Sequence, residues 1–74
     1  MITTPGDRVK AIHPTEAITH GVVVHYRGKH DPLNPRVRWH SGWGTSCSKE
    51  DLLPVTKEEG ETLPAVRLCS IDLK

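Results

Sequence analysis

The stretch Arg36-Val37-Arg38-Trp39-His40-Ser41-Gly42-Trp43-Gly44-Thr45-Ser46-Cys47-Ser48 has the pattern of a β-hairpin. Apolar and charged residues alternate before Ser41-Gly42, and small residues that strands tolerate follow it. Because side chains alternate between the two faces of a strand, Val37 and Trp39 are expected to face a core. Arg36, Arg38 and His40 then point to solvent. The sequence therefore predicts an all-β domain arranged around this hairpin.

Two further β-prone segments precede the hairpin. Residues 8–13 follow the turn residues Pro5-Gly6-Asp7 and end before Pro14. Charged and apolar residues alternate roughly along this segment. Residues 21–27 contain three consecutive valines, the most β-prone run of the chain. We expect Val22, Val24 and Tyr26 to face inward from this strand. The connection over residues 28–35 holds one glycine and two prolines, so it is predicted to be irregular.

After the hairpin, Ser48 is suited to cap a single 3₁₀ turn over residues 49–52, and Leu53-Pro54-Val55 is expected to be a short edge strand. Residues 1–55 thus form one unit. Residues 56–63 are acidic and contain a glycine, which predicts a linker. Residues 65–72 alternate again and predict a sixth strand. Two arrangements stay open for it, because it can join the sheet edge or form a homodimer through residues 65–73.

The composition allows one small domain with a lean core. The chain has 74 residues, of which 35% are hydrophobic, and none is phenylalanine. Burial must therefore rely on the valines and the few aromatic side chains, above all on Trp39. The two cysteines are too few and too far apart for a disulfide framework or a CxxC motif. No basic leader or long apolar segment is present, so we expect a soluble, cytoplasmic protein without membrane contact.

The net charge of +1 conceals an uneven distribution of charge. Residues 1–49 contain seven Lys and Arg against three Asp and Glu, whereas residues 50–74 contain three against six. A basic region of this kind indicates a surface for a polyanion, or a region that the acidic end of the chain covers and solubilises. The second interpretation is the simpler one.

The order of predicted elements resembles an SH3-like barrel of the Tudor, KOW and Mind-bomb kind, and is similar to short bacterial SH3-like proteins. The resemblance rests on Gly6-Asp7-Arg8-Val9, Gly21-Val22-Val23-Val24, Val37-Arg38-Trp39 with Gly42, and Asp51-Leu52, and it covers residues 5–55. It implies five short strands with a 3₁₀ turn before the last. Partners in such families are nucleic acid, methylated or proline-rich peptides, and larger assemblies. A methyl-lysine cage needs several aromatics, and this chain has three in total.

Catalysis and metal binding have weak support in the sequence. Cys47 lacks a nucleophile motif, although His40 is placed to approach it across the hairpin. No pair of ligand residues has the spacing of a zinc finger. We therefore expect no enzyme activity, no cofactor and no metal site. The candidate metal ligands are His13, His20, His25, His30, His40, Cys47 and Cys69.

The basic face of the predicted barrel is the strongest candidate for a binding site. Cations on neighbouring strands give salt-dependent contact with phosphates, and an exposed aromatic adds base stacking. This predicts a sequence-tolerant contact with nucleic acid or a nucleic-acid-associated complex. The alternative is a protein-interaction module in which Trp43 and the open strand edge bind a peptide or partner subunit. The candidate residues are Arg36, Arg38, His40, Trp43, Arg27, Lys29, Lys10 and Tyr26.

Overall fold

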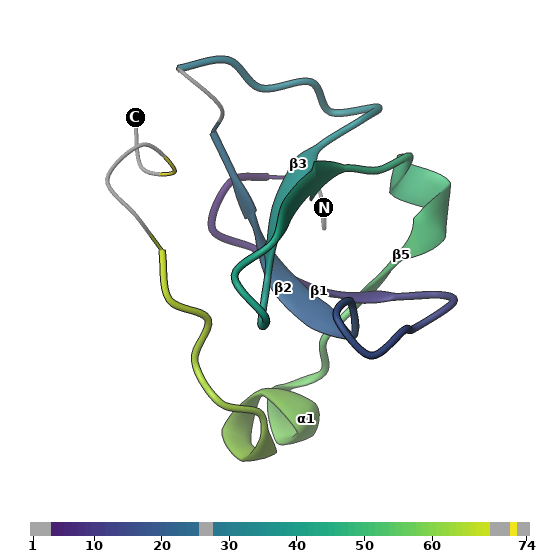
Figure 1. Cartoon of the computed structure of the whole chain (residues 1–74), viewed down its shortest axis with the longest axis vertical. Coiled ribbons are helices and arrows are strands. Elements are labelled where there is room, and N and C mark those ends of the chain that lie inside the picture. Colours follow the sequence, from purple (N-terminus) through teal and green to yellow (C-terminus); the bar gives the residue numbers. More distant parts are fainter. Residues whose placement is uncertain (1–3, 26–27, 69–71, 73–74) are drawn as a thin grey trace.

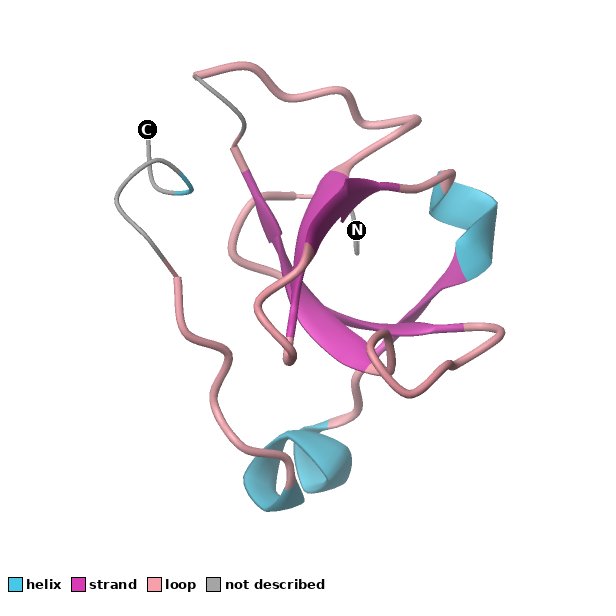
Figure 2. Cartoon of the chain, in the orientation of Figure 1, coloured by secondary structure: helices cyan, strands magenta, loops and turns pink. Residues whose placement is uncertain are grey.

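The computed structural model describes residues 4–25, 28–68 and 72, and within them the protein is an all-β fold, as predicted (Figure 1). Five antiparallel strands form one sheet in the order β4-β3-β2-β1-β5. The sheet curls round, as in a small β-barrel, and a 3₁₀ turn, η1, precedes the last strand (Figure 2). The elements are β1 (Arg8–Ala11), β2 (His20–Val24), β3 (Arg36–Trp39), β4 (Gly44–Ser46), η1 (Lys49–Asp51), β5 (Leu52–Pro54) and α1 (Lys57–Thr62).

The register of the strands defines the core. Val23 lies opposite Val37, and Gly21 lies opposite both Val9 and Trp39. Residues directly opposite each other in an antiparallel pair share a face, so these side chains all point inward. Trp39 is 1% exposed, and its indole Nε1–H donates to the hydroxyl of Thr45. The core cluster consists of Val9, Val23, Val37, Trp39 and Leu52.

The predicted facing of β2 is wrong. Val23 is the core residue, whereas Val22 and Val24 lie opposite Arg38 and Arg36 on the outer face. Three consecutive valines give no apolar and polar alternation, so the partner strand decides which of them faces inward. Val24 is nevertheless 3% exposed on its outer face. Something must therefore cover that side of the sheet.

The predicted acidic linker contains a helix, α1. Thr56 is its N-cap, and the side chain of Thr56 accepts from the backbone N–H of Glu59 while the Glu59 carboxylate accepts from the backbone N–H of Thr56. This is a complete capping box, which satisfies two backbone donors that the first turn of a helix leaves unpaired. The sequence Thr56-Lys57-Glu58-Glu59 carries that signal, and the linker interpretation missed it.

The predicted sixth strand, residues 65–72, is absent from residues 65–68, the part of it that the structure describes apart from Asp72. Residues 69–71 of that prediction lie outside the described residues. Pairing of this segment with the sheet edge therefore has no support in residues 65–68, and the homodimer through residues 65–73 stays a prediction. The backbone carbonyl of Asp72 accepts from the N–H of His25 at 3.1 Å, beside Val24.

Within the described residues, no helix has the length and apolar character needed to cross a membrane. Helix α1 has six residues and carries Lys57, Glu58 and Glu59 in its first turn.

Candidate nucleic-acid interface

The outer face of the curled sheet carries the cations that the sequence predicts there. Strand register places Arg8 opposite Val22 and Arg38 opposite both Val22 and Gly44. Lys10 lies opposite His20, and Arg36 lies opposite Val24 and Ser46. The basic side chains of β1 and β3 thus share one face, as expected from the alternation. Their present partners decide how much of this face is open to a ligand.

Arg38 is engaged by the far end of the chain. Its Nε and Nη2 donate to the two carboxylate oxygens of Asp72, each at 2.9 Å, and its Nη1 donates to the carbonyl of Gly42 at 2.8 Å. The Asp72 side chain is 3% exposed and that of Arg38 is 19% exposed. A bidentate ion pair between a guanidinium and a carboxylate is among the stronger polar contacts in proteins. The acidic end of the chain therefore neutralises this arginine.

Helix α1 holds the cations of β1 in a similar way. Lys10 Nζ donates to both carboxylate oxygens of Glu59, at 2.9 and 2.8 Å. This bond from Lys10, followed by those from Thr56, lowers the pKa of the Glu59 carboxyl. Arg8 Nη1 donates to the carbonyl of Gly60 at 2.8 Å. Arg8, Lys10 and Arg38 are therefore covered by the C-terminal part of the chain. This agrees with the second interpretation of the charge asymmetry, in which the acidic end covers the basic region.

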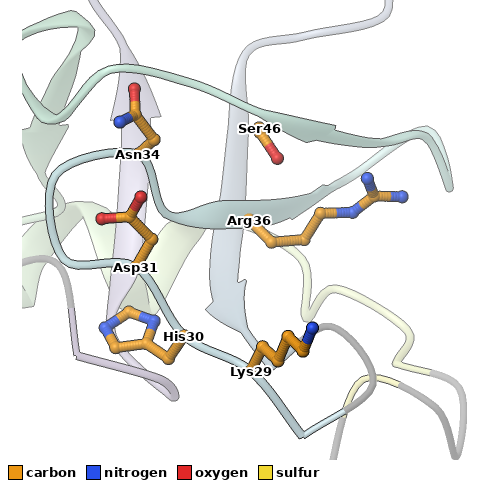
Figure 3. Close-up of a pocket in the computed structure, with 6 residues that line it drawn as sticks. All are labelled: Lys29, His30, Asp31, Asn34, Arg36 and Ser46. Carbon is orange, nitrogen blue, oxygen red and sulfur yellow. The ribbon is translucent and has the colours of Figure 1, made fainter.

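Arg36 and Lys29 lie in a different setting, at a cleft of about 660 Å³ between the β2–β3 connection and β4. Figure 3 shows the ammonium group of Lys29 and the guanidinium group of Arg36 on the same side of this cleft. We call it the cationic cleft. Its lining residues are Lys29, His30, Asp31, Asn34, Arg36 and Ser46.

Gly44 lets the two arginines of β3 lie close together over β4. A Cβ at this glycine would be 3.0 Å from Nη2 of Arg36 and 3.1 Å from Nη1 of Arg38. The guanidinium groups therefore occupy the space that a side chain would fill. Arg38 is paired with Asp72, but its guanidinium group is thus a direct neighbour of that of Arg36, which lines the cationic cleft.

The opposite side of the cationic cleft is polar and carries one carboxylate. Asp31, Asn34 and His30 lie there, away from Lys29 and Arg36 (Figure 3). The Oδ1 atom of Asp31 accepts from the backbone N–H of Leu33 at 2.9 Å, which closes a local turn and directs one oxygen into the loop. The Nδ1 atom of His30 is buried without a hydrogen-bond partner, and its ring lies edge-on to that of His25 with 6.3 Å between centroids.

Trp43 is exposed but lies apart from the two arginines. Trp43 is 60% exposed and directly precedes β4 in the sequence. The backbone N–H of Trp39 donates to the carbonyl of Trp43, so the β3–β4 pairing continues to this residue. By the alternation along β4, Trp43 then falls on the side of Thr45, opposite to Gly44 and its covering guanidinium groups. The structure does not bring the predicted stacking residue and the cations together.

His40 belongs to a pair of stacked histidines on β2 and the end of β3. Its ring lies 4.9 Å from that of His20, with 16° between the planes, and the Thr19 hydroxyl is 3.0 Å from Nδ1 of His40 and 3.2 Å from Nδ1 of His20. Burial lowers the pKa of His20, and His40 and Arg8 act in the same direction, against the backbone carbonyl of Pro64. This pair is a structural contact across the sheet rather than part of the cationic cleft.

The remaining sequence candidates lie elsewhere. Tyr26 and Arg27 are outside the described residues. The Cys47 thiol lies 3.6 Å from the Thr45 hydroxyl, whereas the imidazole of His40 pairs with Thr19. Among residues 4–25, 28–68 and 72, no three His, Cys, Asp or Glu side chains gather in a way that would hold a metal ion.

Comparison with known proteins gives no family. No family model, no curated protein and no solved structure matches the chain. The functional argument therefore rests on the geometry described above. Sequence reasoning found Lys29 and Arg36 but missed Asn34 and Ser46, which come together only when the β2–β3 connection folds beside β4. It indicated that the acidic end of the chain covers part of the basic region, but it did not name Glu59 and Asp72 as the partners.

Proposed function

We propose that the protein is a non-catalytic, SH3-like binding module that contacts the phosphate backbone of nucleic acid through the cationic cleft. The observation that carries the proposal is the position of Lys29 and Arg36 on the same side of an open cleft. Ammonium and guanidinium groups are the usual protein partners of phosphates, and a guanidinium group can bind two phosphate oxygens at once.

The surroundings of the two cations fit a phosphate chain better than a small buried ligand. Ser46 supplies a neutral hydrogen-bonding group near Arg36, and Asn34 supplies another on the opposite side of the cleft, as in many phosphate contacts of nucleic-acid complexes. Asp31 lies on the side of Asn34 and limits how deeply an anion enters. No tryptophan or tyrosine is among the described residues that line the cleft, so we expect contact mainly with the phosphate backbone, which tolerates any sequence. With a net charge of +1, the affinity is expected to be modest.

A salt titration tests this function. A fluorescently labelled oligothymidylate and a duplex of similar length are titrated with the protein, and the binding constant is measured by anisotropy at several salt concentrations. Two phosphate contacts predict a slope of log K against log salt of about −1.4 for the single strand and about −1.8 for the duplex. Lys29→Ala and Arg36→Ala should each weaken binding and reduce the magnitude of the slope by about 0.7 to 0.9.

Lys57→Ala is the matched control, because it removes one positive charge from an exposed position on α1. If general attraction to the whole molecule accounted for binding, Lys57→Ala would weaken it as much as Lys29→Ala does. The absence of binding to either probe at low ionic strength would overturn the proposed function. Thermal melts of each variant show that the fold is retained.

A protein partner is the second candidate, and the exposure of Trp43 favours it. An indole that is 60% exposed at the end of a hairpin is a suitable anchor for a partner surface, because tryptophan is enriched among the residues that dominate interface energies. This function predicts salt-insensitive capture of a protein partner, which Trp43→Ala abolishes and Lys29→Ala leaves intact. A pull-down from native lysate, with and without nuclease, separates the two candidates.

A further inference from the structure

Helix α1, residues 63–68 and Asp72 lie against the outer face of the sheet and contact side chains of β1 and β3. Arg8 of β1 donates to Gly60, and Arg38 of β3 donates to Asp72. The backbone carbonyl of Asp72 accepts from the N–H of His25, the residue directly after β2. Figure 1 shows the segment that follows α1, as far as residue 68, rising past β2. We call residues 64–68 together with Asp72 the C-terminal strap.

The strap ends on the arginine next to the cationic cleft. Both oxygens of Asp72 accept from Arg38, and the backbone carbonyl of Asp72 accepts from His25. Arg67 and Leu68 line a small hollow with Arg38 and Gly42. The strap is therefore held by the ion pair between Arg38 and Asp72 and by the backbone hydrogen bond from His25, the residue directly after β2.

The Asp72 carboxylate occupies the Arg38 fork as a phosphate would. Carboxylate and phosphate both present two oxygens that match the parallel N–H groups of a guanidinium. An attached carboxylate has an advantage over a free anion, because an intramolecular contact does not lose the translational freedom that a bound partner loses. Arg38 is therefore withheld from external anions while the strap is closed.

We propose that the C-terminal strap is an internal competitor of the nucleic-acid phosphate, and that its release adds Arg38 to the surface formed by Lys29 and Arg36. This regulation rests on the proposed function of the cationic cleft. Release joins the two guanidinium groups that already meet over Gly44 into one anion-binding surface. Because a ligand shifts such an equilibrium only through its different affinity for the two states, a phosphate chain that reaches Arg38 favours the open strap.

The full-length variant Asp72→Asn tests the proposal, because an amide keeps the size of the side chain and removes its charge. Two quantities are measured for the wild-type chain and the variant: hydrogen exchange of the His25 amide, which reports closure of the strap, and affinity for a labelled oligothymidylate over a range of salt. In Asp72→Asn we expect faster exchange at His25 and about 5-fold tighter binding, which is a coupling of ordinary size between two sites. The salt slope should become steeper by about 0.7, the value for one additional single-strand phosphate contact.

The double variant Arg38→Gln/Asp72→Asn is the control for the role of Arg38. It opens the strap without supplying the extra cation, so its affinity should return to that of the wild-type chain while His25 exchange stays fast. If Asp72→Asn exchanged faster but bound no tighter than the wild type, the competitor role would be overturned and the cleft would keep its function. Unchanged exchange at His25 would show that the pair does not hold the strap, which also overturns the proposal. If no chain bound at low ionic strength, the proposed function would fall, and the regulation with it.

Discussion

Arg38 and Asp72 form a bidentate ion pair in which both nitrogen–oxygen distances are 2.9 Å. The pair joins β3 to a residue that lies 34 positions after Arg38 in the sequence. The pair converts part of the predicted basic surface into an internal attachment. The cationic cleft lies next to this attachment, because the guanidinium groups of Arg36 and Arg38 both lie over Gly44.

Breaking the Arg38–Asp72 pair should destabilise the protein more than breaking the more exposed pair between Lys10 and Glu59. Asp72→Ala removes two charge-assisted bonds and should lower the free energy of unfolding by about 1–3 kcal/mol. The loss is limited because the strap can detach and leave Arg38 in water. Lys10→Gln should cost less, since the side chains of Lys10 and Glu59 are 35% and 37% exposed. Urea denaturation of the two variants checks this order, and equal losses would contradict it.

Trp39 and Trp43 should differ sharply in their contribution to stability. Trp39→Ala removes the largest core side chain and should cost about 3–5 kcal/mol, which leaves a domain of this size barely folded. Trp43→Ala removes an exposed side chain and should change stability by less than about 0.5 kcal/mol. Because the chain has two tryptophans, the fluorescence of Trp43→Phe reports Trp39 alone. Its emission should be that of a buried indole and shift to longer wavelength on unfolding.

Gly21→Ala should disrupt the pairing of β2 with β3. A Cβ at this position would lie 2.4 Å from the carbonyl oxygen of Arg38 and 2.8 Å from Cγ1 of Val37, and neither contact can be relieved without moving a strand. We expect a loss of about 3 kcal/mol or failure to fold. Gly44→Ala is the comparison, because its Cβ would meet only the ends of two flexible arginine side chains. Thermal melts should show a much smaller loss for Gly44→Ala, and equal losses would refute the close approach at Gly21.

Stability should decrease as the solution becomes mildly acidic, through His20. Burial lowers the pKa of His20 in the folded protein, so below the ordinary histidine value of about 6.5 the unfolded chain takes up a proton that the folded chain resists. The free energy of unfolding is therefore expected to fall as pH drops from about 7.5 to about 5.5. Denaturation curves at both ends of that range test this for the wild-type chain and His20→Gln.

The decrease in the free energy of unfolding between about pH 7.5 and about pH 5.5 should be smaller in His20→Gln than in the wild type. His40→Gln should reduce it in part, because His40 contributes to the lowered pKa of its neighbour. An identical loss in all three chains would assign the pH dependence to other groups.

The sequence predicted the fold where local patterns are decisive. Alternation around Val37 and Trp39 defined the hairpin, and Gly42 adopts the positive φ of 95° that its turn needs. The facing of β2 was not predictable from three adjacent valines, since only the register with β3 distinguishes Val23 from its neighbours. Helix α1 was missed although its capping box is legible in the sequence. Composition alone suggested a linker there.

The candidate site was predictable in its charges but not in its boundaries. Arg36 and Lys29 were identified from the basic strand and the loop that precedes it, and the structure places both at the cationic cleft. The partner of Arg38 could not be read from the sequence, because no local pattern connects Asp72 with a residue so distant in the chain. Trp43 was placed with the cations by proximity in sequence, whereas alternation in the hairpin puts it on the other side.

The most direct test of the proposed phosphate contact is an ¹H–¹⁵N NMR titration of the labelled wild-type chain with unlabelled oligothymidylate at low ionic strength. We expect the largest shifts at the backbone amides of Lys29, His30 and Ser46 and at the Nε–H of Arg36, with little change at the indole N–H of Trp43. Shifts centred on Trp43 and Leu33, or no shifts at all, would contradict it.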